Sequence, residues 1–194
     1  LNENLTFAPQ LLSNGHLLLG TNRLMSDPYY VTGLFEVDFL GKIYREYTIP
    51  GGYHHDVVEL PSGNLLALSS KFEGTVEDLV VEIDKLTGDI VKTWDIEKYI
   101  PITQGPSQMW TSFDWFHNNS VDYDPKTDSI LLSGRHQDIV VSIGKTSKEL
   151  NYVIGDPNQW SQSFVDEFFL TPTGDEFEWQ YAQHSAMYLP NGNI

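Results

Sequence analysis

A short motif, a tight turn followed by an apolar run, recurs along this 194-residue chain and constrains its fold more than any other feature. The copies begin at Leu12, Leu60, Asp124 and Leu189, and each carries Asn-Gly, Ser-Gly or Asp-Pro in its turn. Glycine and asparagine tolerate the positive φ of hairpin turns, so each copy predicts the start of a β-hairpin. A chain that repeats such a unit is expected to fold as a repeat architecture.

A second pattern lies between these copies, at residues 34–43, 80–90 and 140–150, and each of its segments is typical of strand, tight turn and strand. Long apolar stripes of helical period are scarce. The spacing from Gly15 to Gly63 slightly exceeds the roughly 40–45 residues of a four-stranded propeller blade. We therefore predict an all-β fold, a β-propeller of four-stranded blades. A β-sandwich or a solenoid is the alternative, because regular strand spacing alone does not separate these folds.

Two segments interrupt the repeats and are predicted to be loops over one face. Residues 95–115 are rich in Pro, Gln and Trp, and residues 157–178 are rich in Phe and acids. Trp110, Trp115 and Trp160 are expected to pack within or between blades, although an insertion over the channel mouth would also suit a substrate platform.

The charge of the chain excludes two classes of partner. The net charge is −16, and no cluster of Lys and Arg exists to bind the phosphates of nucleic acid or an anionic membrane surface. No apolar run approaches the roughly 20 residues of a membrane span, so no membrane insertion is expected. The absence of cysteine excludes a thiolate nucleophile and a Cys-ligated zinc. The acidic excess, including Glu73, Glu77, Asp78 and the run 166–178, is predicted to be solvated.

Both ends of the sequence suggest a piece of a longer protein. The chain starts at Leu1 and stops at Ile194, inside a copy of the turn that elsewhere opens a strand. We expect residues 1–194 to form an interior portion of a propeller domain, about three blades plus the start of another. An N-terminal domain and the remaining blades would then lie outside this chain, and an isolated fragment would expose unpaired strand edges.

Three polar residues share one position relative to the repeated turn. His55, Asn119 and His184 each stand at the same distance before the turn proline of their copy. The innermost strand of a blade lines the central channel of a propeller, so equivalent positions in successive blades should converge there. Arg135 ends a strand predicted over residues 129–136 and is expected to reach the same channel.

The remaining histidines are harder to assign. His54 precedes His55, and because neighbouring strand residues point to opposite faces, only one of the two is expected to enter the channel. The sequence leaves open which one it is. His16 and His136 lie outside the shared register, and we interpret them as surface residues or as residues that support the site.

Several segments resemble a known family. Residues 53–64, 114–125, 133–138 and 183–186 are similar to the signature segments of bacterial arylsulfate sulfotransferases, in the same order along the chain. The separation between His117 and Arg135 also resembles that of the family. The resemblance extends from about residue 30 to the end of the sequence.

This resemblance implies a six-bladed propeller, of which the chain holds roughly half. It implies an extracytoplasmic enzyme, periplasmic or secreted and often a homodimer, that moves a sulfuryl group from an aryl sulfate to a phenol. The family uses no nucleotide sulfate donor, and neither a cofactor nor a metal is expected. The implied partners are small-molecule aryl sulfates and phenols.

The resemblance also implies roles for individual residues. His184 would be the nucleophile and would pass through a sulfohistidine, while His117, Asn119 and Arg135 would hold the sulfuryl oxygens. His55, or His54 beside it, would complete the donor set and protonate the leaving oxygen. These residue types suit the chemistry, because sulfuryl transfer requires a nucleophile, cationic or N–H donors for the oxygens, and a proton donor.

Two other kinds of function remain open at this point. A metal-dependent propeller hydrolase or lactonase would use His55, His117 and His184 as ligands with a carboxylate such as Asp56. Against it, Arg135 would repel a nearby dication, and hard cations prefer more oxygen ligands than these positions offer. A non-catalytic binding propeller would use the polar groups of the channel to hold water or a small anion.

Overall fold

The computed structural model describes residues 9–21, 31–71, 73–106, 113–174 and 176–194, which form three four-stranded antiparallel sheets. The first sheet contains β1 (Gln10–Leu11), β2 (Leu17–Thr21), β3 (Val31–Val37) and β4 (Ile43–Tyr53). The second contains β5 (Val57–Glu59), β6 (Leu65–Ser69), β7 (Leu79–Ile83) and β8 (Ile90–Asp95). The third contains β9 (Asn118–Asp124), β10 (Ser129–Gly134), β11 (Ile139–Gly144) and β12 (Leu150–Gly155).

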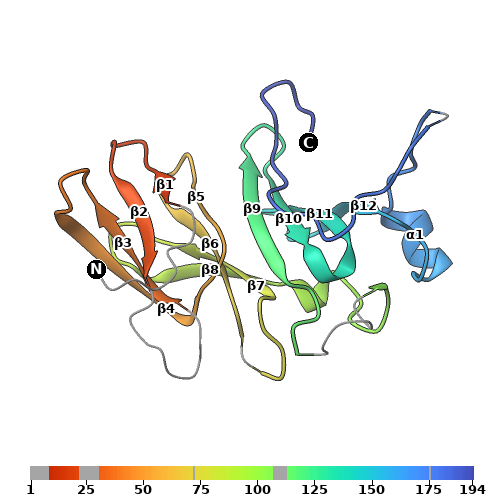
Figure 1. Ribbon diagram of the computed structural model, residues 1–194, viewed down its shortest axis with the longest axis horizontal. Coiled ribbons are helices and arrows are strands. Elements are labelled where there is room, and N and C mark those ends of the chain that lie inside the picture. Colours follow the sequence, from red (N-terminus) through yellow and green to blue (C-terminus); the bar gives the residue numbers. More distant parts are fainter. Residues whose placement is uncertain (1–8, 22–30, 72, 107–112, 175) are drawn as a thin grey trace.

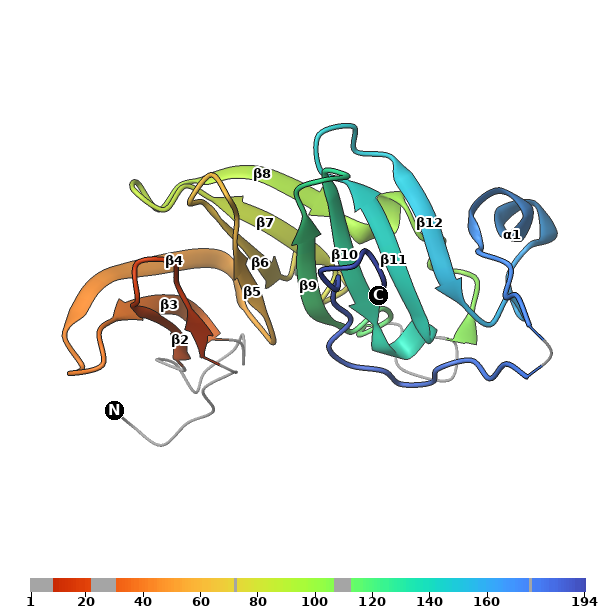
Figure 2. The ribbon, with the colours of Figure 1, turned by 90° about the horizontal axis from the view of Figure 1, so that it is seen from above.

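Within each sheet the strands pair in the order in which they follow along the chain. Figures 1 and 2 show the three sheets side by side, again in chain order. Three successive meanders of four antiparallel strands are blades of a β-propeller, so the predicted fold is confirmed. A sandwich would instead stack two sheets face to face.

Three of the four repeated turns, those that begin at Leu12, Leu60 and Leu189, have one geometry. The amide of the turn's first leucine donates to the carbonyl four residues later, at 2.8 Å for Leu12 and Leu60 and at 2.7 Å for Leu189. The glycine inside each of these turns has a φ between +82° and +88°, which a side chain would strain. The last turn of the chain is therefore built like those that open β2 and β6.

The largest core cluster lies between the second and third sheets and includes large aromatic side chains. Trp94, Trp115 and Phe116 are almost completely buried, and Trp160 is 8% exposed. Removing a side chain of this size from water stabilises the fold by roughly 1.5–3 kcal/mol. Packing is therefore the role of Trp115 and Trp160, as predicted, while Trp110 lies outside the described residues.

Hydrogen bonds between neighbouring blades repeat at equivalent positions. Asp56 Oδ2 accepts from the backbone amide of Val121 at 3.0 Å, and Ser120 Oγ accepts from that of Ala186 at 3.0 Å. Asp56 and Ser120 stand at the same place before their turns. The segment around Ala186 is thus attached to the third blade as β9 is attached to the second, and Figure 1 shows this segment beside β9.

The two predicted insertions are only partly loops. Residues 157–178 contain α1 (Gln162–Phe168), so the prediction of a loop is wrong for that part. The helix is held because Phe164 stacks on Trp160, with ring centroids 5.5 Å apart. Within 95–115, the 3-10 helix η1 (Ile96–Lys98) buries Ile96 in the core. No described helix has the length and hydropathy that a membrane span requires.

The acidic residues divide into two groups. Glu73 and the described acids of 166–178 are exposed, as predicted. Glu77 and Asp78 are buried, so their assignment to a solvated face is wrong. Asp78 accepts a hydrogen bond from Thr75 and pairs with Lys71, and Glu77 faces histidines of the candidate site. Buried carboxylates persist where such partners offset the cost of desolvation.

Candidate functional site

Two histidines form the start of the candidate site, and each lies in the loop that precedes the first strand of a blade. His55 lies between β4 and β5, and His117 lies immediately before β9. Both have a φ of +52°, a left-handed conformation that turns the side chain out of strand alternation. Their ring centroids lie 5.0 Å apart. The prediction that only one of His54 and His55 enters the channel is based on the alternation of side chains along a strand. This basis is wrong, because neither residue lies in a strand.

The structure brings His54 and His55 into direct contact and distinguishes them by burial. His54 has no exposed surface, and its Nε2 lies 3.0 Å from the carbonyl oxygen of Ser69. A carbonyl only accepts, so Nε2 carries the His54 proton. Nδ1 of His54 then accepts from Nδ1 of His55 at 3.1 Å. This arrangement leaves the lone pair of neutral His55 on Nε2.

Burial is also the main cause of the titration behaviour of this pair. It lowers the pKa of His54 and, despite the opposing charge of Glu77, lowers the pKa of His55 to about 4. The positive charge of His117 lowers the pKa of His55 further. Both rings are therefore neutral near pH 7.

His117 has the opposite character because two carboxylates hold it. Its Nδ1 lies 2.8 Å from Glu77 Oε2 and 2.7 Å from Asp114 Oδ2. Burial by itself lowers the pKa of His117, but the hydrogen bonds and charges of Asp114 and Glu77 outweigh it and raise the pKa to about 9. His117 is therefore an imidazolium near pH 7, and its Nε2–H is a cationic donor.

Arg135 is held by the histidine that follows it. Both belong to η3 (Arg135–Gln137), which starts where β10 ends, and the Arg135 amide donates to the His117 carbonyl at 3.2 Å. Arg135 Nη1 lies 2.7 Å from His136 Nε2. His136 is buried rather than superficial, and its ring stacks on that of His117 with centroids 4.5 Å apart. Of the two interpretations of His136, the supporting role fits this geometry.

Asn119 and His184 complete the set. Asn119 is buried, and its Nδ2 donates to the carbonyl of Gln183 at 2.8 Å, which holds the chain next to His184 against the third blade. The His184 side chain is exposed, and its Nδ1 donates to the carbonyl of Ala182 at 3.2 Å. A proton on Nδ1 for this contact leaves the lone pair of the His184 ring on Nε2. The six candidate residues of the sequence therefore lie at one end of the second and third blades.

Two residues of the site escaped the interpretation of the sequence: Glu77, from the loop before β7, and Asp114, which both contact His117. His136, which holds Arg135, is interpreted from the sequence as a surface residue or as a residue that supports the site. Asp114 stands within the motif around His117, which is the signal that could have identified it. Glu77 lies among other acids and far along the chain from its histidines, so no local pattern distinguishes it.

Two groups of side chains are close enough to suggest a cation site. Ligand atoms of His54, His55 and Glu77, and likewise of Asp114, His117 and His136, lie within 4.8 Å of one another. Hydrogen bonds already connect members of both groups, which explains the close approach without an ion. The guanidinium of Arg135 would also repel a dication near His136.

We predict that activity of the full-length protein falls as the pH rises through about 9, where His117 loses its proton. The groups that face His117 are the carboxylates of Glu77 and Asp114 and the rings of His55 and His136. The pKa of His117 in the folded state lies above the ordinary histidine value of about 6.5, so this charge also stabilises the fold below about pH 6.5 and ceases to do so above about 9.

The pH profile of kcat/KM of the full-length protein checks this prediction. Asp114→Asn removes one of the two carboxylates and should move the alkaline limb to lower pH. An alkaline limb that is the same in wild type and Asp114→Asn would contradict the assignment to His117.

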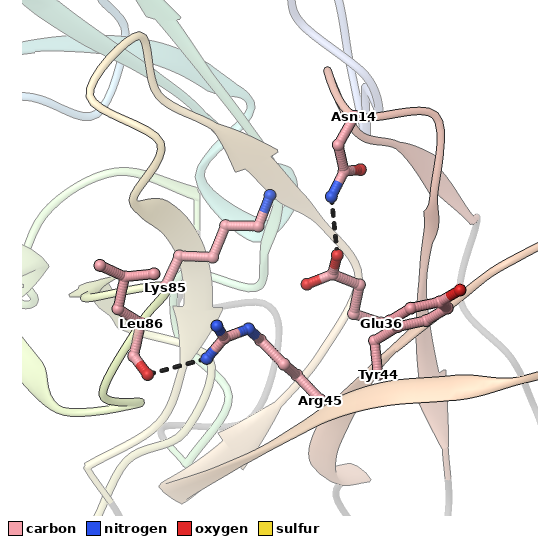
Figure 3. A pocket seen from close by; sticks show the side chains of 6 residues that line it. All are labelled: Asn14, Glu36, Tyr44, Arg45, Lys85 and Leu86. Carbon is pink, nitrogen blue, oxygen red and sulfur yellow. Dashed lines mark hydrogen bonds between the residues drawn. The ribbon is translucent and has the colours of Figure 1, made fainter.

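A hollow of about 650 Å³ lies elsewhere, between the first blade and the turn that joins β7 to β8. Figure 3 shows its lining, where Asn14 donates to Glu36 and Arg45 donates to the carbonyl of Leu86. Lys85, which also lines it, pairs with Glu59 at 2.7 Å. The hollow shares no residue with the histidine site, and these contacts identify it as a groove between two blades.

Comparisons with known proteins identify the family of the chain. The chain matches the family "Arylsulfotransferase (ASST)" over residues 4–194. It is 24% identical to the arylsulfate sulfotransferase AssT of Escherichia coli and 22% identical to that of Lelliottia amnigena, in each case over 82% of this chain. The matched part is 36% of each relative, so the chain spans about a third of their length.

Similar solved structures support the fold alone. A protein of unknown function from Bacteroides caccae has a TM-score of 0.55 at 11% identity, covering 80% of this chain and 52% of that one. A catalytically inactive virginiamycin B lyase from Staphylococcus aureus, solved with quinupristin, has a TM-score of 0.52 at 12% identity, covering 81% of this chain and 43% of that one.

Proposed function

Because the chain belongs to the arylsulfotransferase family, we propose that the full-length protein transfers a sulfuryl group from an aryl sulfate to a phenol through a sulfohistidine. The observation that carries the proposal is that two cations, His117 and Arg135, lie next to each other at one end of the second and third blades. The neutral histidines His54 and His55 lie beside them. No nucleotide sulfate donor is required in this mechanism.

The cationic side chains can stabilise the negative charge on the sulfuryl oxygens of the substrate. A sulfuryl group in transfer carries negative charge on its oxygens, and donors fixed in advance stabilise that charge best. His117 supplies an N–H cation and Arg135 supplies a guanidinium, whose planar fork suits two oxygens at once. The amide of Asn119 adds a neutral donor next to the segment that carries His184.

We assign the nucleophile to His184. Its Nδ1–H is directed to the carbonyl of Ala182, so the lone pair of Nε2 is available to attack sulfur. The N–S bond forms as the S–O bond to the aryl group breaks, and the phenolate leaves with the electron pair. An acceptor phenol then takes the sulfuryl group from His184 in the reverse sense.

Protonation of the leaving oxygen, the role expected of His55 from the resemblance, does not fit an unprotonated Nε2, and we assign His55 to the proton transfer of the second step instead. In the resting state its proton is on Nδ1, directed to His54, and its Nε2 is unprotonated. It can therefore accept the proton of the acceptor phenol as the phenol attacks the sulfohistidine. His54, without exposed surface, is proposed to fix the tautomer of His55 through the Ser69 carbonyl.

The setting of this reaction is proposed on the family alone. We propose a six-bladed propeller in which this chain is an interior portion, about three blades and the start of a fourth. The enzyme would be periplasmic or secreted and would form a homodimer. Its partners would be small aryl sulfates and phenols.

A metal-dependent hydrolase is the second candidate, because two groups of histidine and carboxylate ligand atoms lie within 4.8 Å. It would cleave its substrate with metal-activated water and would form no sulfohistidine. The two candidates differ in their response to chelators.

The test of the proposal is a steady-state analysis of the full-length protein with a chromogenic aryl sulfate and a phenol. One histidine must be loaded by the donor before it meets the acceptor, so parallel double-reciprocal lines are expected. EDTA should leave the rates unchanged. Intersecting lines without trapped sulfohistidine would exclude the mechanism, and activity that EDTA removes and zinc or calcium restores would favour the hydrolase.

A further inference from the structure

We infer that Asp114 and His136 are positioning residues that fix both cations of the site from one loop, an inference that rests on the proposed function. Asp114 lies in the loop before β9 and contacts both histidines concerned. Neither it nor His136 need touch the substrate. They act through His117 and Arg135.

Asp114 uses two different oxygen atoms. Its side-chain Oδ2 accepts from Nδ1 of His117 at 2.7 Å, and its backbone carbonyl accepts from Nδ1 of His136 at 2.7 Å. The first contact fixes the ring of His117 so that Nε2–H is its remaining donor. Glu77 duplicates the charge of this contact, but only Asp114 also binds His136.

His136 in turn fixes the position of the Arg135 guanidinium. The carbonyl of Asp114 accepts a hydrogen bond from Nδ1–H of His136, so Nε2 of the neutral ring is an acceptor. Arg135 Nη1 donates to this Nε2 at 2.7 Å. Burial is the main reason that the pKa of His136 is lowered, and the charges of His117 and Arg135 lower it further, so the ring stays a neutral acceptor. The stack on His117 fixes its plane.

The consequence is that the two cations are placed relative to each other rather than independently. Donors act on a developing charge only if they stay where that charge forms, and a displacement of about 1 Å can cost about 100-fold in rate. A change in Asp114 or His136 should therefore reduce sulfuryl binding and transfer without removing a cation.

Two double-mutant cycles on the full-length protein test this inference. The first combines Arg135→Ala with His136→Phe, which keeps the stacked ring but removes the acceptor. The second combines His117→Ala with Asp114→Asn, which removes the carboxylate but keeps the backbone carbonyl. Each variant is measured for affinity toward inorganic sulfate by calorimetry and for kcat/KM with 4-nitrophenyl sulfate. His16→Phe, at the rim of the first blade, is the matched control.

Residues that act through a partner lose their effect when the partner is gone. We expect His136→Phe to weaken sulfate binding by about 10-fold in the wild type and by less than about 2-fold in Arg135→Ala. Asp114→Asn should behave likewise toward His117→Ala. His16→Phe should match wild type in both measurements.

Additive losses in both cycles would overturn the positioning role, because a general loss of structure does not depend on the partner. Wild-type protein that binds no sulfate would overturn it as well. If wild type binds sulfate but cleaves no aryl sulfate, the proposed function fails, and the positioning role is still decided by the sulfate-binding cycles.

Discussion

We expect His184→Asn in the full-length protein to abolish cleavage of an aryl sulfate donor and to leave no sulfated histidine in trapped enzyme. An amide is a far poorer nucleophile than the Nε2 lone pair of imidazole, and loss of a nucleophile costs more than about 1,000-fold in rate. The measurement is donor cleavage together with mass spectrometry of the quenched enzyme. Asparagine keeps a side-chain donor near Ala182, so the local chain should stay in place.

The matched comparison is His16→Asn, the same exchange at a histidine of the first blade. This variant should keep wild-type rates and the covalent intermediate. An intermediate found on His55 or His117, with His184→Asn still active, would show that the nucleophile belongs to another blade.

Loss of Arg135 or His117 is expected to slow formation of the proposed sulfohistidine without abolishing it. Removing one preorganised donor to a developing oxyanion typically costs on the order of 100- to 1,000-fold in rate. Arg135→Lys should also be impaired, because an ammonium cannot reproduce the planar contact with two oxygens and cannot donate to His136 in the same geometry.

Rapid quenching and mass spectrometry of the His184 peptide separate this effect from loss of the nucleophile. In His117→Ala and Arg135→Ala the intermediate should still accumulate on His184, but slowly. If either variant leaves His184 permanently unmodified, that residue does more than stabilise charge. Wild-type rates in Arg135→Lys would mean that a positive charge suffices and that the guanidinium fork does not matter.

The fold could be predicted because its information is local. Glycine at Gly15, Gly63 and Gly192 permits the positive φ of each turn, and these turns set the spacing of the strands. Helix α1 was missed because it is short and is stabilised by packing of Phe164, Val165 and Phe168 against the core cluster, a tertiary contact that no short window of sequence reveals.

The site could be predicted only in part, for the same reason. Counting from the turns found His55, Asn119 and His184, but the left-handed conformations of His55 and His117 displace the side chains from strand alternation. The partnership of Glu77 with His117 joins residues from different loops, so charge composition alone assigned Glu77 to the solvent. Burial and ion pairing across blades are properties of the folded chain.

The bond between Asp56 and Val121 joins the second blade to the third directly beside His55. The same kind of bond joins Ser120 to Ala186, two residues beyond His184. The site residues therefore belong to more than one blade. They keep their mutual distances only while adjacent blades stay in register. A slight opening between blades would separate the attacking nitrogen from the cations long before any sheet lost its strands. Activity of the full-length protein should thus be lost at a smaller displacement between blades than the one that changes the strand content measured by spectroscopy.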